Sequence, residues 1–294
     1  MGPPIPELPG VEHRWIKTSR IEMHVAEAGS GEPLILLHGW PQHWYAWRRV
    51  LPSLAERYRV LCPDLRGLGW SEAPPKGYDK ESLASDLLAL LDALELERVK
   101  LIGHDWGGLV GFLAALRAPE RIERFVALNE IHPWTRIHVR DFWEGWRLWY
   151  QALLAMPWIG GSALRRSSSL VRTLFRQWSA VDAWSDEELA IFVEPLHEPM
   201  RAAASVQYYR QFVLKELPLM LAGRYRRTRL RTPTLLLFGE EDGVLRPYQL
   251  RGYEAHADQM QVELVPGVGH FIAEEAPEVV IRRSLEFLES RPTA

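Results

Sequence analysis

Short apolar runs alternate with amphipathic stretches over the first 130 residues of the chain. The runs predict four strands, at Leu34–Leu37, Val60–Cys62, Val99–Ile102 and Phe125–Leu128. Apolar positions with helical spacing predict three helices between them, near Trp44–Leu54, Leu83–Leu94 and Leu109–Arg117. Apolar strands that alternate with helices are typical of a parallel sheet with helices on both faces.

The pattern changes between residues 132 and 222, where no run has the alternation of a strand but Trp, Arg and Leu recur at helical spacing. After residue 222 the earlier pattern resumes with two strands and a closing helix, at Thr234–Phe238, Val262–Val265 and Ala276–Leu288. A helical segment inserted into an α/β chain is typical of a cap built into one crossover connection. We therefore expect a core of residues 1–131 and 223–294 and an all-helical cap of residues 132–222.

Charge and composition narrow the classes of partner. The 294 residues carry a formal net charge of −3, whereas binding of nucleic acid or an anionic membrane requires clustered excess Lys and Arg. The expected partner is a small neutral molecule, with no nucleic acid and no membrane. Cys62 is the one cysteine, so no intramolecular disulfide can form, and its place after an apolar strand predicts a buried, inert thiol. No secretion signal and no run of 18 apolar residues is found, so a cytoplasmic location is expected.

The segment Gly103-His104-Asp105-Trp106-Gly107 lies between a predicted strand and a predicted helix. The form G-x-Nu-x-G in this context is a nucleophile elbow, in which small residues flank a strained turn that exposes the nucleophile above the sheet. Here Asp105 stands where a serine is usual. A carboxylate that attacks saturated carbon becomes an alkyl ester, so the leaving group must depart from sp³ carbon. Epoxide oxygen and halide both meet this requirement.

An elbow nucleophile needs a histidine base and an acid that orients it, and in this architecture the acid precedes the histidine along the chain. Asp242 lies in a glycine-flanked loop after the strand Thr234–Phe238, and His270 lies in the loop after the strand Val262–Val265. Of the ten histidines, His270 alone combines a loop after a strand, a flanking glycine and the required order. The two residues are therefore the expected acid and base.

The loop His38-Gly39-Trp40-Pro41 follows the strand Leu34–Leu37, the place from which this fold takes an oxyanion donor. The backbone N–H groups of Trp40 and Trp106 are then the expected oxyanion hole. Without the elbow, the same loop would indicate only a tight turn that Gly39 and Pro41 allow.

Together these motifs resemble the α/β-hydrolase family, and within it the epoxide hydrolases. The resemblance covers most of the chain outside the cap, through His38–Pro41, Trp44–Arg48, Asp64–Ser71, Gly103–Gly107, Ala118–Ile122 and the loops that bear Asp242 and His270. It implies the α/β-hydrolase fold, a mostly parallel eight-stranded sheet flanked by helices with an inserted all-helical cap. It also implies a hydrolase that acts on ether bonds and opens an epoxide to a vicinal diol, with no cofactor and no metal.

The resemblance further implies two cap tyrosines that donate hydrogen bonds to the epoxide oxygen. Tyr209 resembles the second of them, because Tyr208 lies about 100° round the helix and would point elsewhere. Tyr150 resembles the first. Trp143 and Trp146 precede Tyr150 by seven and four residues, which predicts one shared helical face. On that face the tryptophans either pack the cap on the sheet or line the pocket.

On this interpretation Asp105 opens the ring while Tyr150 and Tyr209 donate to the leaving oxygen. Water activated by His270, which Asp242 orients, then hydrolyses the ester and releases the diol. The aromatic cap favours an apolar epoxide.

Two alternatives stay open. A haloalkane dehalogenase would use the same aspartate and histidine, with the indole N–H of Trp106 holding the halide, although Trp40 stands where many dehalogenases have a second donor, asparagine. Some dehalogenases place the acid near the position of Glu130, which would leave Asp242 without a role. A non-catalytic small-molecule receptor on the same fold is the second alternative. The sequence predicts no oligomeric state.

Overall fold

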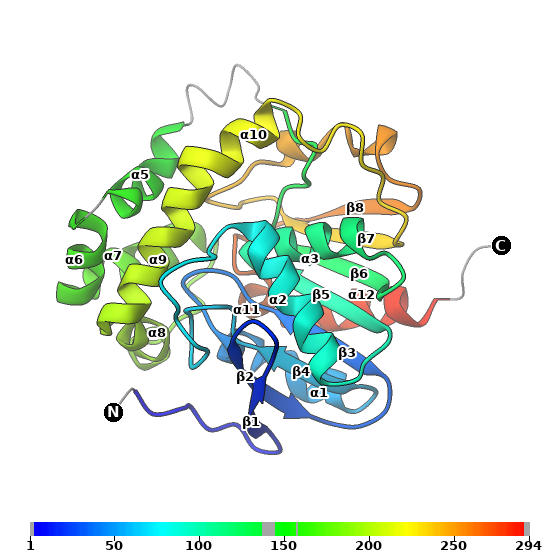
Figure 1. Ribbon diagram of the computed structural model, residues 1–294, viewed down its shortest axis with the longest axis horizontal. Helices are drawn as coiled ribbons and strands as arrows, with labels where there is room; N and C mark the ends of the chain where they lie inside the picture. Colours follow the sequence, from blue (N-terminus) through cyan, green and yellow to red (C-terminus); the bar gives the residue numbers. More distant parts are fainter. Residues whose placement is uncertain (1–2, 137–144, 157, 291–294) are drawn as a thin grey trace.

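The computed structural model describes residues 3–136, 145–156 and 158–290. An eight-stranded sheet with the strand order β1-β2-β4-β3-β5-β6-β7-β8 runs through the molecule (Figure 1). Its strands are β1 (Glu12–Lys17), β2 (Glu22–Ala28), β3 (Pro33–Leu37), β4 (Arg59–Pro63), β5 (Val99–His104), β6 (Ile122–Leu128), β7 (Thr234–Gly239) and β8 (Met260–Val265). The pairs from β4 to β8 are parallel, and β1 and β2 join antiparallel at one edge. The predicted mostly parallel eight-stranded sheet is confirmed.

Central strands are buried on both faces, which explains why they read as continuous apolar runs. Ile35 and Leu37 of β3 belong to one apolar cluster, whereas Leu34 and Leu36 belong to another. Successive side chains of a strand point to opposite faces, so the two clusters are the two sides of the sheet. The edge strand β1 is mostly exposed and has no apolar period, and the hydrophobic pattern therefore did not locate it.

Helices of the core cover both sides of the sheet. The helices α2 (Lys80–Ala93) and α3 (Trp106–Arg117) pack on one side. The other side is covered by α1 (Leu51–Ala55), α11 (Ile272–Glu275) and α12 (Pro277–Glu289). Short 3₁₀ turns complete the core, at η1 (Trp44–Trp47), η5 (Pro247–Leu250) and η6 (Tyr253–Ala255).

The predicted single helix over Trp44–Leu54 is wrong, because the structure has the 3₁₀ turn η1 followed by the separate helix α1. Pro52 lies in the first turn of α1. Proline has no backbone N–H to donate to a preceding helical turn, so it interrupts a continuous helix but is well tolerated at a helix start.

Cys62 is buried as predicted, and burial raises the pKa of its thiol well above the ordinary value.

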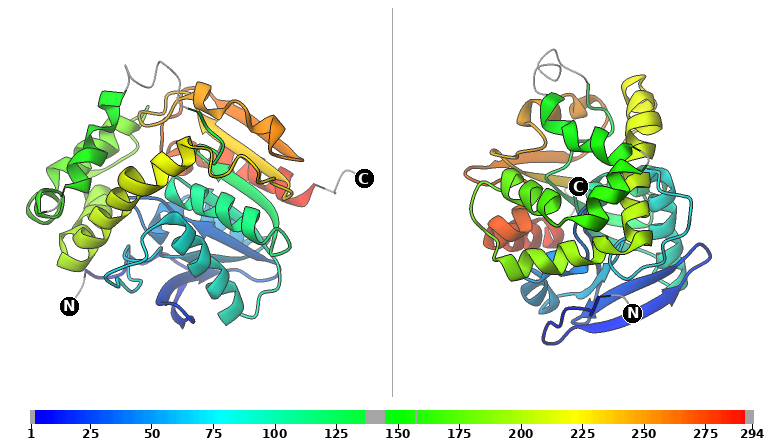
Figure 2. Two further views of the ribbon diagram at one scale, coloured as in Figure 1. Left: turned by 45° about the horizontal axis from the view of Figure 1, so that its top comes forward. Right: turned by 90° about the vertical axis from the view of Figure 1, so that its left-hand side faces the viewer.

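A run of helices is inserted between β6 and β7 and gathers on one side of the core (Figure 2). The insertion contains η2 (Gly145–Leu148), α5 (Trp149–Ala155), α6 (Ile159–Arg166), α7 (Ser169–Trp178), α8 (Asp186–Val193), η3 (Glu194–His197), α9 (Pro199–Gln211), η4 (Phe212–Glu216) and α10 (Leu217–Leu221). The division into a core and a cap domain at residues 132–222 stays a prediction. None of the described helices is long and apolar enough to cross a membrane.

Trp146 does not have either of the roles expected for it. Its side chain is 68 % exposed in η2, so it neither packs the insertion on the sheet nor lines a pocket. The helix α5 begins only at Trp149, and the assumed continuous helical face therefore does not extend back to Trp146. Trp143 lies outside the described residues.

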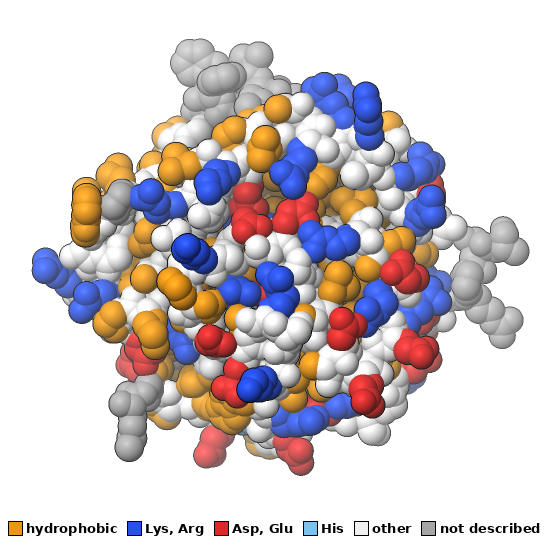
Figure 3. Space-filling model, viewed as in Figure 1, with side chains coloured by type: hydrophobic (Ala, Val, Ile, Leu, Met, Phe, Trp, Pro, Cys, Tyr) orange, Lys and Arg blue, Asp and Glu red, His pale blue; other side chains and the backbone are white. Residues whose placement is uncertain are grey.

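The outer surface carries charges of both signs. On the face in Figure 3, Lys and Arg side chains lie among Asp and Glu side chains, with apolar side chains between them.

A buried ion pair joins α2 to the insertion beside the nucleophile elbow. The Nζ atom of Lys80 lies 3.3 Å from Oε2 of Glu216 in the π-helical turn η4, and the Lys80 side chain is fully buried. The same Nζ lies 4.0 Å from the ring centroid of Trp106. Burial lowers the pKa of Lys80, and the charge of Glu216 opposes that change.

We expect Glu216→Leu to destabilise the protein by about 3 to 5 kcal/mol, because it leaves the charge of Lys80 buried without its partner. The double variant Lys80→Met, Glu216→Leu removes both charges and should lose less stability than Glu216→Leu alone. Urea unfolding of the wild type, both single variants and the double variant measures the coupling. Additive losses would contradict the predicted interaction.

Candidate active site

Asp105 lies at the sharp turn from β5 to α3, with φ 50° and ψ −128°. Backbone atoms approach both glycines that flank this turn closely. A Cβ atom on Gly103 would lie 2.5 Å from the carbonyl oxygen of Gly107, and a Cβ on Gly107 would lie 2.2 Å from that of Leu37. Only glycine fits at either position, so the flanking residues of the motif are explained by close backbone approach. The turn presents the Asp105 side chain above the sheet, as the elbow predicts.

The structure brings Asp105, Asp242 and His270 together. Asp242 lies in the loop after β7 and His270 in the loop after β8. The Nδ1 atom of His270 lies 2.8 Å from Oδ2 of Asp242, and its Nε2 atom lies 3.5 Å from Oδ2 of Asp105. The backbone N–H of His270 donates to the carbonyl of Trp178 in α7, so the inserted helices also hold the histidine loop.

Asp242 is fully buried and accepts several hydrogen bonds besides that from His270. Donors are the side-chain amide of Asn129 at 2.7 Å and the backbone N–H groups of Val244 and Leu245 at 2.6 and 2.9 Å. Burial opposes ionisation of this carboxyl, but the charge of His270 and these donors together hold its pKa below the ordinary value. Asn129 was not identified in the sequence, although a polar residue directly after a buried strand is a signal for it.

Glu130 is not the partner of His270. Its Oε1 atom accepts from the backbone N–H of Ile131 at 2.7 Å, and among the described residues the carboxylate bonded to the imidazole is that of Asp242. This geometry favours Asp242 over Glu130 as the orienting acid.

Two carboxylates determine the charge of His270. Burial alone would lower the pKa of the imidazole, but Asp242 and Asp105 raise it to about 10. For the neighbouring His104, burial and then the charge of His270 outweigh the same two carboxylates and lower its pKa to about 4. The two carboxylates thus favour the imidazolium form of His270 in the free protein.

The backbone N–H of Trp40 donates to Oδ1 of Asp105 at 2.9 Å. Gly39 allows this approach, because a Cβ atom there would lie 2.2 Å from the same oxygen. The loop is held by His38, whose Nε2 accepts from the N–H of Leu65 at 3.0 Å, so that Nδ1 carries the proton donated to the carbonyl of Gly39. The Asp105 side chain accepts no hydrogen bond from the first turn of α3, where the N–H of Trp106 lies.

Tyr150 and Tyr209 are both buried and face each other, with ring centroids 5.6 Å apart in a T-shaped arrangement. Burial, followed for Tyr209 by the nearby Tyr150, raises the pKa of each phenol, so both hydroxyls keep their protons. The amide of Gln151 donates to the hydroxyl of Tyr150 at 3.2 Å. Tyr208 points elsewhere, as its position on the helix predicts, and donates to the carbonyl of Arg66 at 2.9 Å.

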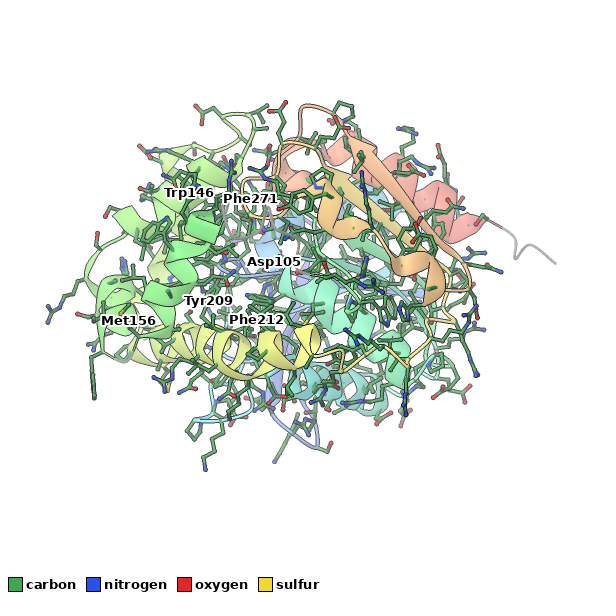
Figure 4. All side chains as sticks on the ribbon, turned by 90° about the horizontal axis from the view of Figure 1, so that it is seen from above. Asp105, Trp146, Met156, Tyr209, Phe212 and Phe271 are labelled. Atoms are coloured by element: carbon green, nitrogen blue, oxygen red, sulfur yellow. The ribbon has the colours of Figure 1, made fainter. Side chains whose placement is uncertain are left out.

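A cavity of about 240 Å³ reaches Asp105 from the side of the inserted helices. In Figure 4, Asp105 lies near the centre of the molecule beside the inserted helix that carries Tyr209 and Phe212. Apolar side chains form much of the cavity wall, among them Ile131, Leu148, Phe212, Leu217, Val244 and Leu245. Tyr150 and Glu130 also line the cavity, whereas Tyr209 is outside the lining and packs against Tyr150 and Trp106.

The two indole groups next to Asp105 differ in their partners. The Nε1 atom of Trp40 donates to the hydroxyl of Ser205 at 3.0 Å and is therefore occupied. The Nε1 atom of Trp106 is buried without a well-aligned partner in the described part of the chain, and the ring of Tyr209 lies beside the indole, with centroids 5.9 Å apart.

Known proteins match both the sequence and the fold. Residues 32–277 match the family model described as alpha/beta hydrolase fold. The soluble epoxide hydrolase of Corynebacterium sp. (strain C12) is 33% identical over 290 residues, which cover 94% of this chain and 97% of that protein. Epoxide hydrolase 4 of Homo sapiens is 28% identical over 287 residues, which cover 93% of this chain and 77% of that protein. The solved structure of the epoxide hydrolase CorEH without ligand has a TM-score of 0.81 and 28% identity, with 95% of this chain and 98% of that chain covered.

Proposed function

The chain belongs to the epoxide hydrolases of the α/β-hydrolase fold, and we propose that it opens an apolar epoxide to a vicinal diol through an alkyl ester on Asp105. As a member of this group it is a hydrolase that acts on ether bonds. One observation carries the proposed mechanism: the two oxygens of Asp105 face different groups, Oδ1 the N–H of Trp40 and Oδ2 the imidazole of His270. The apolar wall of the cavity supports an apolar substrate.

In the first step Oδ2 of Asp105 attacks a ring carbon of the epoxide, and the carbon–oxygen bond of the ring breaks. Tyr150 and Tyr209, whose hydroxyls keep their protons, donate to the oxygen as negative charge develops on it. The leaving oxygen takes the proton of one of these two hydroxyls and becomes a hydroxyl group, which leaves that tyrosine as a phenolate. The phenolate regains its proton after the second step, when the second proton of the attacking water leaves the Asp105 acid. Oδ1 stays as the carbonyl oxygen of the ester, beside the N–H of Trp40.

In the second step water attacks the carboxyl carbon of the ester, and Nε2 of His270 takes its proton. The N–H of Trp40 stabilises the oxyanion that forms at Oδ1, with the N–H of Trp106 as the proposed second donor. The ester bond breaks, the alkoxide takes a proton from His270, and the diol leaves. Asp105 is regenerated with one oxygen from water.

Alkylation of Asp105 lowers the pKa of His270 and so favours the neutral imidazole that the second step needs. In the free enzyme the two flanking carboxylates raise the pKa of His270 and so favour its imidazolium form. The ester of Asp105 carries no charge, so alkylation removes one of the two groups that raise the pKa of His270. A lower pKa favours the neutral imidazole, which can take a proton from water.

The variant Asp105→Asn imitates this loss of charge. We expect it to lower the pKa of His270 by about 1 to 3 pH units, because one opposite charge close to the imidazolium is removed. An NMR titration of ring-labelled histidine in the wild type and the variant measures the change. A pKa that stayed the same or rose would contradict the role given to Asp105.

A paired assay tests the proposed reaction. Styrene oxide should yield phenylethane diol, and a bromoalkane of similar size should release no bromide. The second candidate function is a haloalkane dehalogenase, which is favoured by the indole N–H of Trp106, because this N–H has no well-aligned partner in the described residues. A dehalogenase would release bromide and form no diol. The control Asp105→Asn should give neither product. Absence of both products with the wild type would favour a non-catalytic receptor.

A further inference from the structure

Glu130 is a buried carboxyl group beside Asp105 that the mechanism above does not use. It follows β6, which pairs with β5 on the side opposite to β3. Trp40 follows β3 and Asp105 follows β5, so Glu130 and Trp40 lie on opposite flanks of the nucleophile. Oδ1 of Asp105 is bonded to Trp40, and Oδ2 lies 3.5 Å from Nε2 of His270. Glu130 is therefore on the flank where hydrolysis of the ester needs a water molecule.

Contacts hold this carboxyl group in one place. Its Oε1 atom accepts from the N–H of Ile131 at 2.7 Å. Its stem packs on the start of α3, since a Cβ atom on Gly108 would lie 2.9 Å from Cβ of Glu130. The other oxygen, Oε2, accepts no hydrogen bond within the described residues, and Glu130 lines the cavity that reaches Asp105. The Nε2 atom of His270 is also buried without a well-aligned partner there.

The surroundings favour the protonated form of Glu130. Burial, and then the charge of Asp105, raise the pKa of this carboxyl well above its usual range, whereas the charge of His270 acts in the opposite direction. Lys80 is a further buried charge within electrostatic reach of Glu130. Because Oε1 already accepts from a backbone N–H, the proton belongs on Oε2, which makes Oε2 a hydrogen-bond donor at the cavity wall.

We propose that Glu130 binds the hydrolytic water of the second step, through its Oε2 hydroxyl, between itself and Nε2 of His270. This inference rests on the proposed function, because it assigns a residue to the hydrolysis of the Asp105 ester. The water accepts a hydrogen bond from Glu130 and donates one to His270, with a lone pair left for the carboxyl carbon of the ester.

The hydrogen bond from Glu130 strengthens during the reaction. When His270 takes a proton from the water, the attacking oxygen gains negative charge and becomes a better acceptor. The new carbon–oxygen bond forms at Asp105, the ester bond breaks, and the alkoxide receives its proton from His270. Glu130 keeps its own proton throughout, so all atoms and charges balance. A donor that binds more strongly in the transition state than in the ground state accelerates this step alone.

Two substitutions of equal size test the proposal. Glu130→Gln keeps a donor, because the amide oxygen can accept from Ile131 while its NH₂ group faces the cavity. Glu130→Leu keeps the volume and removes the donor. The matched control is Glu123→Leu in β6, the strand that Glu130 follows, where the side chain is 41% exposed and pairs with Lys100 at 3.8 Å. Rapid quenching with styrene oxide, followed by mass spectrometry of the intact protein, gives the rates of ester formation and ester hydrolysis separately.

We expect Glu130→Leu to slow ester hydrolysis about 10²-fold, the size of effect seen when one preorganised donor is lost, with ester formation nearly unchanged. Glu130→Gln and Glu123→Leu should hydrolyse the ester within about threefold of the wild-type rate, since each keeps the donor in place. Equal slowing of both steps in Glu130→Leu, or a wild-type rate of hydrolysis, would overturn the proposal. Slow hydrolysis in Glu130→Gln would overturn the assignment of Glu130 as a donor. Failure of the proposed function is distinct, because the wild type would then form no ester at all.

Discussion

The variant His270→Gln is expected to react once with an epoxide and then stop. Ester formation requires Asp105 and the tyrosine hydroxyls but no base, so the first step should proceed. Hydrolysis requires a base at Nε2, and its loss should lower steady-state turnover about 10³-fold. Rapid mixing should reveal a burst of one equivalent of consumed epoxide. Mass spectrometry of the intact protein should show an increase equal to the mass of the substrate.

A half-buried histidine away from Asp105 provides the control for that experiment. His256 lies in the loop after η6, stacked on Trp134, and His256→Gln should turn over like the wild type without accumulating adduct. Normal turnover in His270→Gln, with no increase in mass, would remove His270 from the role of base.

Replacement of both cap tyrosines, Tyr150→Phe with Tyr209→Phe, should slow ester formation about 10³-fold. Each hydroxyl supplies a donor to the leaving oxygen, and the loss of one donor in such a site typically costs about 10²-fold or more. The two effects should not be additive, because the rings lie 5.6 Å apart and the remaining hydroxyl can compensate in part. Single-turnover rates of ester formation measure the change.

Tyr208→Phe is the matched control for the tyrosine pair. It removes a buried hydroxyl one residue from Tyr209, but that hydroxyl donates to the carbonyl of Arg66. The expected effect is a loss of about 1 kcal/mol in stability, with ester formation unchanged. Tyr209 is not among the lining residues of the cavity, so Tyr209→Phe alone tests whether its hydroxyl reaches the leaving oxygen. Wild-type rates of ester formation in both single variants and in the double variant would contradict the assigned role.

The sequence predicted the core of the site because the relevant signals are local. Gly103 and Gly107 flank Asp105 at the end of an apolar strand, and the close backbone approach that they permit is encoded in those few residues. Asp242 and His270 each follow a strand of the parallel sheet. The carboxyl ends of such strands meet at one edge, so residues far apart in the chain could be expected to converge there.

Other features could not be predicted because they depend on tertiary contacts. The pairing of Lys80 with Glu216 joins segments 136 residues apart, and no local pattern indicates it. The exposed position of Trp146 follows from where α5 begins, which helical spacing alone did not determine. Asn129 and Glu130 are neighbours after β6, yet one contacts Asp242 and the other faces the cavity. Only the backbone geometry after the strand separates their roles.

The most direct test of the account is one catalytic cycle in water enriched in ¹⁸O with the enzyme in excess of the epoxide. If water attacks the carboxyl carbon of an Asp105 ester, one heavy oxygen should remain in the peptide that contains Asp105. The diol should carry none of the label in that cycle. Label found in the diol and absent from residue 105 would mean that water attacks the epoxide directly, and this result would contradict the covalent mechanism.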